Sequence, residues 1–194
     1  MQRRGEVNRK TAETDVSVSL LLEGSGEVEV DTGLGFLDHM LAALGRHAAF
    51  DMKLSATGDT VVDDHHTVED CAIVLGRAFD EALGDRNGIT RFGSAYAPLD
   101  ESLSRVVVDL SGRPWPEVEI AFNRPTVGDV ATENIIHFFR SFAIEARMAL
   151  HVDLIRGDND HHKAESAIKA LALALRQAVT VRGDGIPSTK GSLR

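Results

Sequence analysis

The chain has 194 residues, enough to bury a hydrophobic core as one large domain or two small ones, and its 43% hydrophobic and 26% charged residues exclude a disordered or fibrous chain. Its net charge of −9 has the wrong sign for gripping phosphate backbones, so we expect no nucleic-acid partner. No apolar run approaches the ~20 residues of a membrane span, and the charged N-terminus has no apolar stretch behind it, so we expect a cytoplasmic protein with no membrane partner.

Runs of β-branched and apolar residues bounded by glycine predict strands, and longer stretches with apolar residues three and four apart predict helices. In the first part of the chain we expect strands at about 16–23, 26–31 and 51–57, and helices at about 35–47 and 66–83. In the second part we expect strands at about 103–110, 115–122 and 151–156, and helices at about 132–149 and 162–181. Each part therefore follows the order ββαβα.

The two parts also repeat in sequence. The block from Glu13 to Gly24 matches Glu101 to Gly112 at an offset of 88, and Asp64 to Asp70 matches Asp160 to Ser166 at an offset of 96. We therefore predict an α+β fold of two pseudo-symmetric ββαβα halves, each a sheet with helices packed on one face. The halves are expected at about 9–90 and 91–182, within a single domain over residues 1–194 that ends in a short C-terminal tail at 183–194.

Two HHxxE motifs at predicted helix starts, and two lone histidines, occupy matching places in the halves. Residues three or four apart share a helix face, so each glutamate reaches the same region as the histidines one turn before it. Adjacent histidines point roughly 100° apart, so the members of a pair are expected to serve different metal ions. Imidazole and carboxylate without thiolate suits Mn, Fe, Zn, Co or Ni, and the set divides into two sites of four ligands. The predicted ligands are His39, His65, His66, Glu69, His137, His161, His162 and Glu165.

Departures from the repeat are expected to mark the substrate. Lys169 lies one helical turn beyond Glu165 on the same face, about 6 Å along the helix, whereas the matching residue in the first half is Ile73. Such an ammonium suits an anionic group on a substrate held at the metals. Loops marked by glycine or proline carry further candidate substrate-binding cations and hydroxyls, at Arg91, Arg113, Ser188, Thr189 and Lys190.

Five motifs carry a family resemblance, and they occur in a specific order and spacing. They are GFLDHM at Gly35 to Met40, DDHHTVED at Asp63 to Asp70, HFFRSFA at His137 to Ala143, DNDHHKAE at Asp158 to Glu165 and PSTKG at Pro187 to Gly191. With them the chain resembles, from about Arg9 to its C-terminus, the imidazoleglycerol-phosphate dehydratases of histidine biosynthesis in their single-function form. No motif position departs from the family pattern.

The resemblance implies a duplicated α+β fold, two Mn²⁺ ions per active site held by the eight ligands above, and a homo-oligomeric shell of 24 subunits with active sites at subunit interfaces. It also implies that the phosphate of a small imidazole substrate is held by the residues matching Arg91, Arg113, Lys169, Ser188 and Lys190. Glu13 matches a position near the substrate diol.

The reaction implied is dehydration of D-erythro-1-(imidazol-4-yl)glycerol 3-phosphate to 3-(imidazol-4-yl)-2-oxopropyl phosphate. The proton to be lost sits on a carbon without an adjacent carbonyl, so the imidazole ring must supply the electrons that expel the neighbouring hydroxyl. A carboxylate then has to take the proton. Glu13 is the first candidate and His47 the second, although His47 fits a helix C-terminal cap equally well; the predicted catalytic set is Glu13, Glu165 and His47.

Two other functions share the same ligands. A binuclear metal-dependent phosphoester hydrolase would use a metal-bound hydroxide, although bridging aspartates are common in such enzymes and the set here is dominated by histidine. A non-catalytic metal-storage or metal-sensing protein would have no need of Lys169 and the loop cations, which only one half carries.

Overall fold

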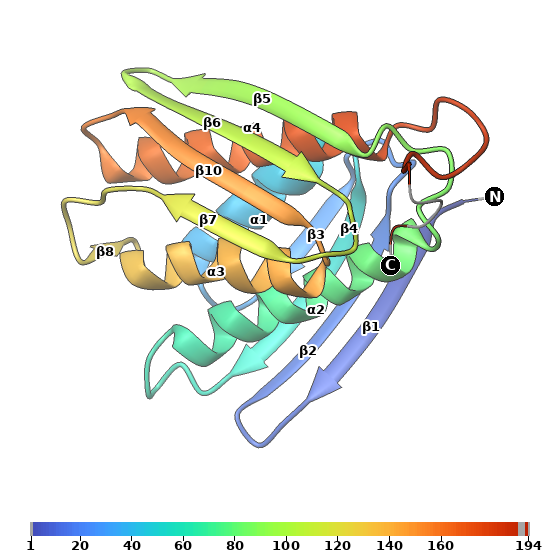
Figure 1. Ribbon diagram of the computed structural model, residues 1–194. Helices are drawn as coiled ribbons and strands as arrows, with labels where there is room; N and C mark the ends of the chain where they lie inside the picture. Colours follow the sequence, from blue (N-terminus) through green and yellow to red (C-terminus); the bar gives the residue numbers. More distant parts are fainter. Residues whose placement is uncertain (1, 190–192, 194) are drawn as a thin grey trace.

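The computed structural model describes residues 2–189 and Leu193 (Figure 1). Its first half contains four strands and two helices. In chain order these are β1 (Arg4–Lys10), β2 (Thr14–Leu21), β3 (Val28–Asp31), α1 (Gly35–Ala48), β4 (Asp51–Gly58) and α2 (His65–Leu83).

The second half repeats this order and adds a short hairpin. Its elements are β5 (Phe92–Leu99), β6 (Ser102–Asp109), β7 (Trp115–Glu119), β8 (Thr126–Val127), β9 (Val130–Ala131), α3 (Thr132–Glu145), β10 (Ala149–Arg156) and α4 (Asp160–Val179). No helix in the described part of the chain is both long and apolar enough to cross a membrane.

The sheets of the two halves have the same topology. Their strand orders are β1-β2-β4-β3 and β5-β6-β10-β7, and only the β3–β4 and β7–β10 pairs are parallel. The register repeats as well, because Val18 pairs with Leu54 in the first sheet and Val106 pairs with Val152 in the second. The predicted α+β fold of two similar halves is therefore confirmed.

The helices lie between the two sheets (Figure 1). In the first sheet α2 packs on β1 and β2, in the second α4 packs on β5 and β6, and across the middle α2 contacts α3 while α1 contacts α4. Alternation along β2 directs Val16, Val18 and Leu20 into this core and leaves Asp15 and Ser17 exposed. Each fully buried side chain of this size contributes about 1.5–3 kcal/mol, so the facing helix layers hold the halves together as well as filling each of them.

Each half begins with a strand that was not predicted, β1 or β5, so apart from the β8–β9 hairpin its order is βββαβα rather than ββαβα. Both lie at sheet edges, and β1 (RGEVNRK) has too few apolar residues to show a strand alternation. Gly5 and Gly93 mark where the helices cross these strands: a Cβ on Gly5 would lie 1.9 Å from the carbonyl oxygen of Ala78, and one on Gly93 would lie 2.0 Å from that of Ala174.

Helix boundaries and the β8–β9 hairpin also differ from prediction. The third helix ends at Glu145 rather than 149, because Ala149 already belongs to β10. The last helix begins at Asp160, two residues early, since the Asn159 side chain caps it by accepting from the His161 N–H at 2.9 Å. The strands β8 and β9 are two residues each, too short to show a period.

Candidate metal centre and active site

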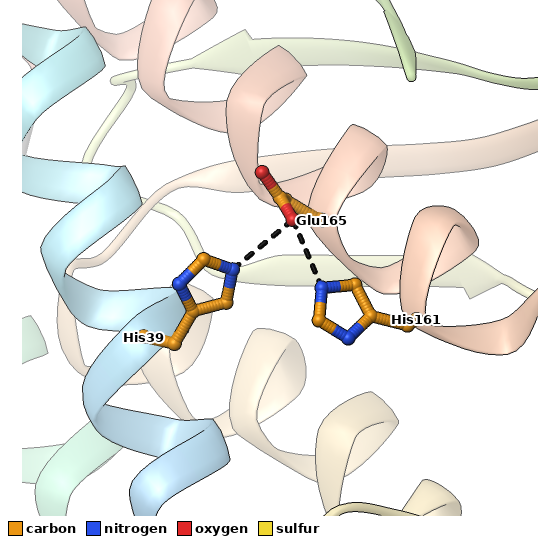
Figure 2. Close-up of side chains that lie close together, drawn as sticks. All are labelled: His39, His161 and Glu165. Atoms are coloured by element: carbon orange, nitrogen blue, oxygen red, sulfur yellow. Dashed lines mark hydrogen bonds and ion pairs between the residues drawn. The ribbon is translucent and has the colours of Figure 1, made fainter. Parts of the chain in front are cut away.

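One cluster of possible metal ligands joins α1 to α4. Glu165 Oε2 lies 3.0 Å from His39 Nε2 and 3.1 Å from His161 Nε2, so both imidazoles point at the same carboxylate oxygen (Figure 2). Glu165 is the most buried of the three residues, with 13% of its side chain exposed, while the imidazoles reach the surface. The ligand atoms lie close enough together for a single cation to contact all three residues.

A second cluster joins α2 to α3. Glu69 Oε1 lies 2.8 Å from His137 Nε2, and Glu69 Oε2 lies 3.9 Å from His65 Nε2. The His65 and His137 rings stack with centroids 5.1 Å apart. The Nδ1 of His65 contacts the Oδ1 of the buried Asn134 at 2.9 Å, which holds the ring with Nε2 toward the cluster.

Both clusters are assembled across the pseudo-symmetric halves. Each takes a histidine and the glutamate four residues later from one helix, and a lone histidine from a helix of the other half. The duplication maps one set onto the other, so the two sites are copies of one design. The helix contacts between the sheets are what bring the ligands together.

The second histidine of each pair points elsewhere. His66 Nδ1 lies 3.1 Å from both oxygens of Asp59, and His162 Nδ1 lies 2.7 Å from Glu101 Oε2. The hydrogen bond to Asp59 raises the pKa of His66, and the bond to Glu101 raises the pKa of His162. His66 and His162 are thus oriented by carboxylates but join neither cluster of their own chain. That the two members of a pair serve different metal ions stays a prediction.

Side-chain contacts hold the starts of two of these helices, α1 and α4. Asp129, in the turn between β8 and β9, accepts the N–H groups of Gly35 (2.6 Å) and Phe36 (2.9 Å) at the start of α1. At the start of α4, Asp160 and Lys163 form a buried ion pair at 2.8 Å. These contacts fix where α1 and α4 begin, and with them the backbone positions of His39 and His161.

The donor set fits divalent cations of the first transition row. It offers imidazole nitrogen and carboxylate oxygen only, with Nε2 facing the carboxylate and, for His65, Nδ1 bound to a protein acceptor. That second hydrogen bond is the usual companion of a metal-ligating histidine. Cys71, the sole thiol, is buried in the core, and burial raises its pKa to about 12, so thiolate ligation plays no part.

The cation that only the second half carries lies against the first cluster. Lys169 Nζ is 2.6 Å from Glu165 Oε1. Burial raises the pKa of the Glu165 carboxyl, but the bonds from Lys169, His39 and His161 outweigh it and bring the pKa to about 2. His47, on α1, is close enough that burial and the Lys169 charge lower its pKa.

Glu13 stands at the tip of the β1–β2 hairpin. Its side chain is 55% exposed, and Oε1 lies 3.8 Å from His66 Nε2. The tip is braced from behind: the hydroxyl of the buried Thr14 donates to Asp70, and Arg9 forms an ion pair with the same carboxylate. The contacts of Thr14 and Arg9 therefore hold the backbone next to Glu13 in place, while the Glu13 carboxylate is accessible to solvent.

Two of the predicted phosphate cations within the described residues, Lys169 and Arg91, contact different parts of α4. Arg91 binds Asp109 through Nε at 2.6 Å and the carbonyl of Pro187 through Nη1 at 2.8 Å. Its backbone N–H bonds to the carbonyl of Ala178 near the end of α4, whereas His161 and Glu165 of the first cluster lie toward the start of that helix. Arg113 is exposed in the β6–β7 loop, Ser188 and Thr189 lie beyond Pro187, and Lys190 falls outside the described residues.

Sequence reasoning missed the residues that orient the ligands, namely Asp59, Glu101, Asn134 and Asp129. Of these, only Glu101 had a visible signal, since it repeats Glu13 at the offset of 88. The others come from loops or from the far half, where no spacing rule links them to the histidines.

Comparison with known proteins gives one consistent family. Residues 32–175 match the family model described as imidazoleglycerol-phosphate dehydratase. Relatives of that name include one from Phytophthora nicotianae, 56% identical over 98% of this chain and 42% of its own length, and one from Zymomonas mobilis, 54% identical over the whole of both.

Solved structures agree with this comparison. The imidazoleglycerol-phosphate dehydratase of Staphylococcus aureus is 37% identical, with a TM-score of 0.84 over 92% of this chain and 99% of its own. The corresponding protein of Pyrococcus furiosus is 35% identical, with a TM-score of 0.84 over 96% of this chain and 99% of its own.

Proposed function

This chain belongs to the imidazoleglycerol-phosphate dehydratase family, and we propose that it converts D-erythro-1-(imidazol-4-yl)glycerol 3-phosphate to 3-(imidazol-4-yl)-2-oxopropyl phosphate in histidine biosynthesis. The observation that carries the proposal is the pair of equivalent His, His and Glu clusters, each built from both halves of the chain. A dehydratase acting on an imidazole without a neighbouring carbonyl needs a site for the ring and a separate proton acceptor.

We propose that the clusters hold two Mn²⁺ ions. His39, His161 and Glu165 would hold one ion, and His65, Glu69 and His137 the other. Bound ions of this kind act as Lewis acids that lower the pKa of a coordinated nitrogen acid. The open, surface-reaching imidazoles leave room for a further ligand at each cluster.

Glu13 is proposed as the group that takes the proton from the carbon next to the leaving hydroxyl. Loss of that proton and of the hydroxyl amounts to one water and gives an enol, which becomes the ketone when a proton returns to the carbon beside the ring. The carboxylate suits this role because it is exposed, stands beside His66 and sits on a braced hairpin tip. His47 lies beside Lys169, where it is a weaker candidate.

The phosphate is proposed to bind cations from more than one copy of the chain. Lys169 lies at its own cluster, but the Arg91 N–H bonds to Ala178, which lies 13 residues beyond Glu165 on α4, or about 20 Å at 1.5 Å per residue. The three-carbon chain between imidazole and phosphate is far too short to span that length. A homo-oligomer, expected from the family to have 24 subunits, places Arg91, Arg113 and the 188–190 segment of one copy at the clusters of another. His66 and His162 are proposed to bind at the clusters of another copy, because each is oriented by a carboxylate and joins neither cluster of its own chain.

Turnover by metal-stripped protein, before and after addition of Mn²⁺, tests the proposal. We expect the ketone product to appear only with the metal and no inorganic phosphate to be released. Release of phosphate without ketone would instead identify a phosphoester hydrolase. No turnover with two metal ions bound per chain would overturn the enzymatic proposal and favour a storage or sensing role.

A further inference from the structure

The residue one helical turn beyond the glutamate differs between the two clusters. Lys169 Nζ lies 2.6 Å from Glu165 Oε1, with 21% of its side chain exposed. The matching residue of the other cluster, one helical turn beyond Glu69, is the half-buried Ile73. The two clusters otherwise contain the same residue types on equivalent helices. The effect of Lys169 on cation binding can therefore be judged by comparing the two clusters of one chain.

The lysine changes what its glutamate can offer. Both oxygens of Glu165 are engaged, Oε1 by Lys169 and Oε2 by the two imidazoles, and the side chain is 13% exposed. Glu69 is freer: its Oε1 contacts His137, its Oε2 lies 3.9 Å from His65, and the side chain is 34% exposed. A cation entering the Glu165 cluster therefore has to share its only carboxylate with an ammonium.

We propose that Lys169 makes the two clusters bind divalent cations with unequal affinity, so that the cluster around Glu69 fills first and the cluster around Glu165 second. The inference rests on the proposed function in that it takes the clusters to be the metal sites. A unit positive charge within a few ångströms of a divalent cation lowers its affinity about tenfold, even with the screening of water and salt. The same lysine, kept at the weaker site, leaves a positive charge there to hold an anionic part of a ligand.

The test is a Mn²⁺ titration of the metal-free full-length protein, with free Mn²⁺ followed by its electron paramagnetic resonance signal. We expect one tight and one weak Mn²⁺ site per chain, with affinities that differ about tenfold. Glu69→Gln is expected to remove the tighter class, and Glu165→Gln the weaker one. Two Mn²⁺ sites of equal affinity would overturn this inference and leave the proposed function standing. A protein that binds no Mn²⁺ would overturn the proposed metal dependence as well.

Reciprocal substitutions separate charge from structure. Lys169→Ile copies the first half into the second and is expected to bring the two affinities together by tightening the weaker class. Ile73→Lys copies the second half into the first and is expected to weaken the tighter class about tenfold. Lys169→Met preserves the aliphatic stem and serves if the isoleucine variant unfolds. If a Lys169 variant is folded, as checked by thermal denaturation, and its two Mn²⁺ affinities still differ about tenfold, the proposed role of the lysine is refuted.

Discussion

Sharing of active sites between copies can be tested by mixing two inactive chains. His39→Ala removes a ligand of the first cluster, and Arg91→Ala removes a proposed phosphate cation. The two residues lie near opposite ends of α4, because His39 contacts Glu165 near its start while the Arg91 N–H bonds to Ala178 near its end. A helix rises 1.5 Å per residue, so the separation is about 20 Å or more, too far for one substrate to reach both residues of the same chain.

Co-expression of the two variants with different tags, followed by isolation of mixed oligomers, supplies the assay. Each active site is expected to draw His39 from one chain and Arg91 from another, so random mixing leaves both intact in about a quarter of the sites. Turnover should return to about a quarter of the wild-type value. Arg105→Ala is the matched control, because Arg105 pairs with Asp153 on the same sheet and has no place in the proposed site. Mixed oligomers that stay inactive would refute sharing.

Three further predictions follow from the described contacts. Glu13→Gln is expected to leave Mn²⁺ content unchanged while lowering kcat about 10²- to 10⁴-fold, and unchanged turnover would exclude it from proton transfer. Gly5→Ala and Gly93→Ala are each expected to lower the free energy of unfolding by about 2 kcal/mol in urea titrations, because the new Cβ meets a helix carbonyl; Gly183→Ala, which meets nothing within 4 Å, should be neutral. The Glu165 carboxyl has a pKa of about 2, below its ordinary 4.5, so it stabilises the metal-free protein above pH 4.5 and this contribution is lost as pH falls toward 2. The loss should reach about 3 kcal/mol by denaturant unfolding and be missing in Glu165→Gln.

Repetition made most of the fold predictable from the sequence. A strand such as β2 alternates cleanly, because one face of its side chains is buried and the other is mostly exposed. The edge strands β1 and β5 were missed, since an edge strand buries little and tolerates charged or very small residues. Small residues there serve the close approach of a helix, a requirement of tertiary packing that leaves no period in the sequence.

The sequence predicted which residues form the two clusters but not how the clusters are assembled. The HHxxE spacing, repeated twice, predicted one histidine and the glutamate of each cluster, and matching places in the two halves predicted the lone histidines His39 and His137. It did not show that each cluster draws a histidine from the opposite half, because that pairing depends on which helices face each other between the sheets. The orienting residues Asp59 and Asn134 reach their histidines through a loop and a helix of the other half, so no local pattern connects them.

Glu13 and Glu101 show how a duplicated position acquires two roles. Glu101 accepts the N–H groups of Asp158 (3.1 Å) and Asn159 (2.8 Å) and orients His162, contacts that lower the pKa of its carboxyl and leave it no freedom. In the first half, residues 59–64 separate β4 from α2, whereas only residues 157–159 separate β10 from α4. The longer loop supplies Asp59 to orient His66, so the glutamate at the hairpin tip is released from that task. Under the proposed function, the longer loop therefore leaves the Glu13 carboxylate available to exchange protons with the substrate, whereas Glu101 orients His162.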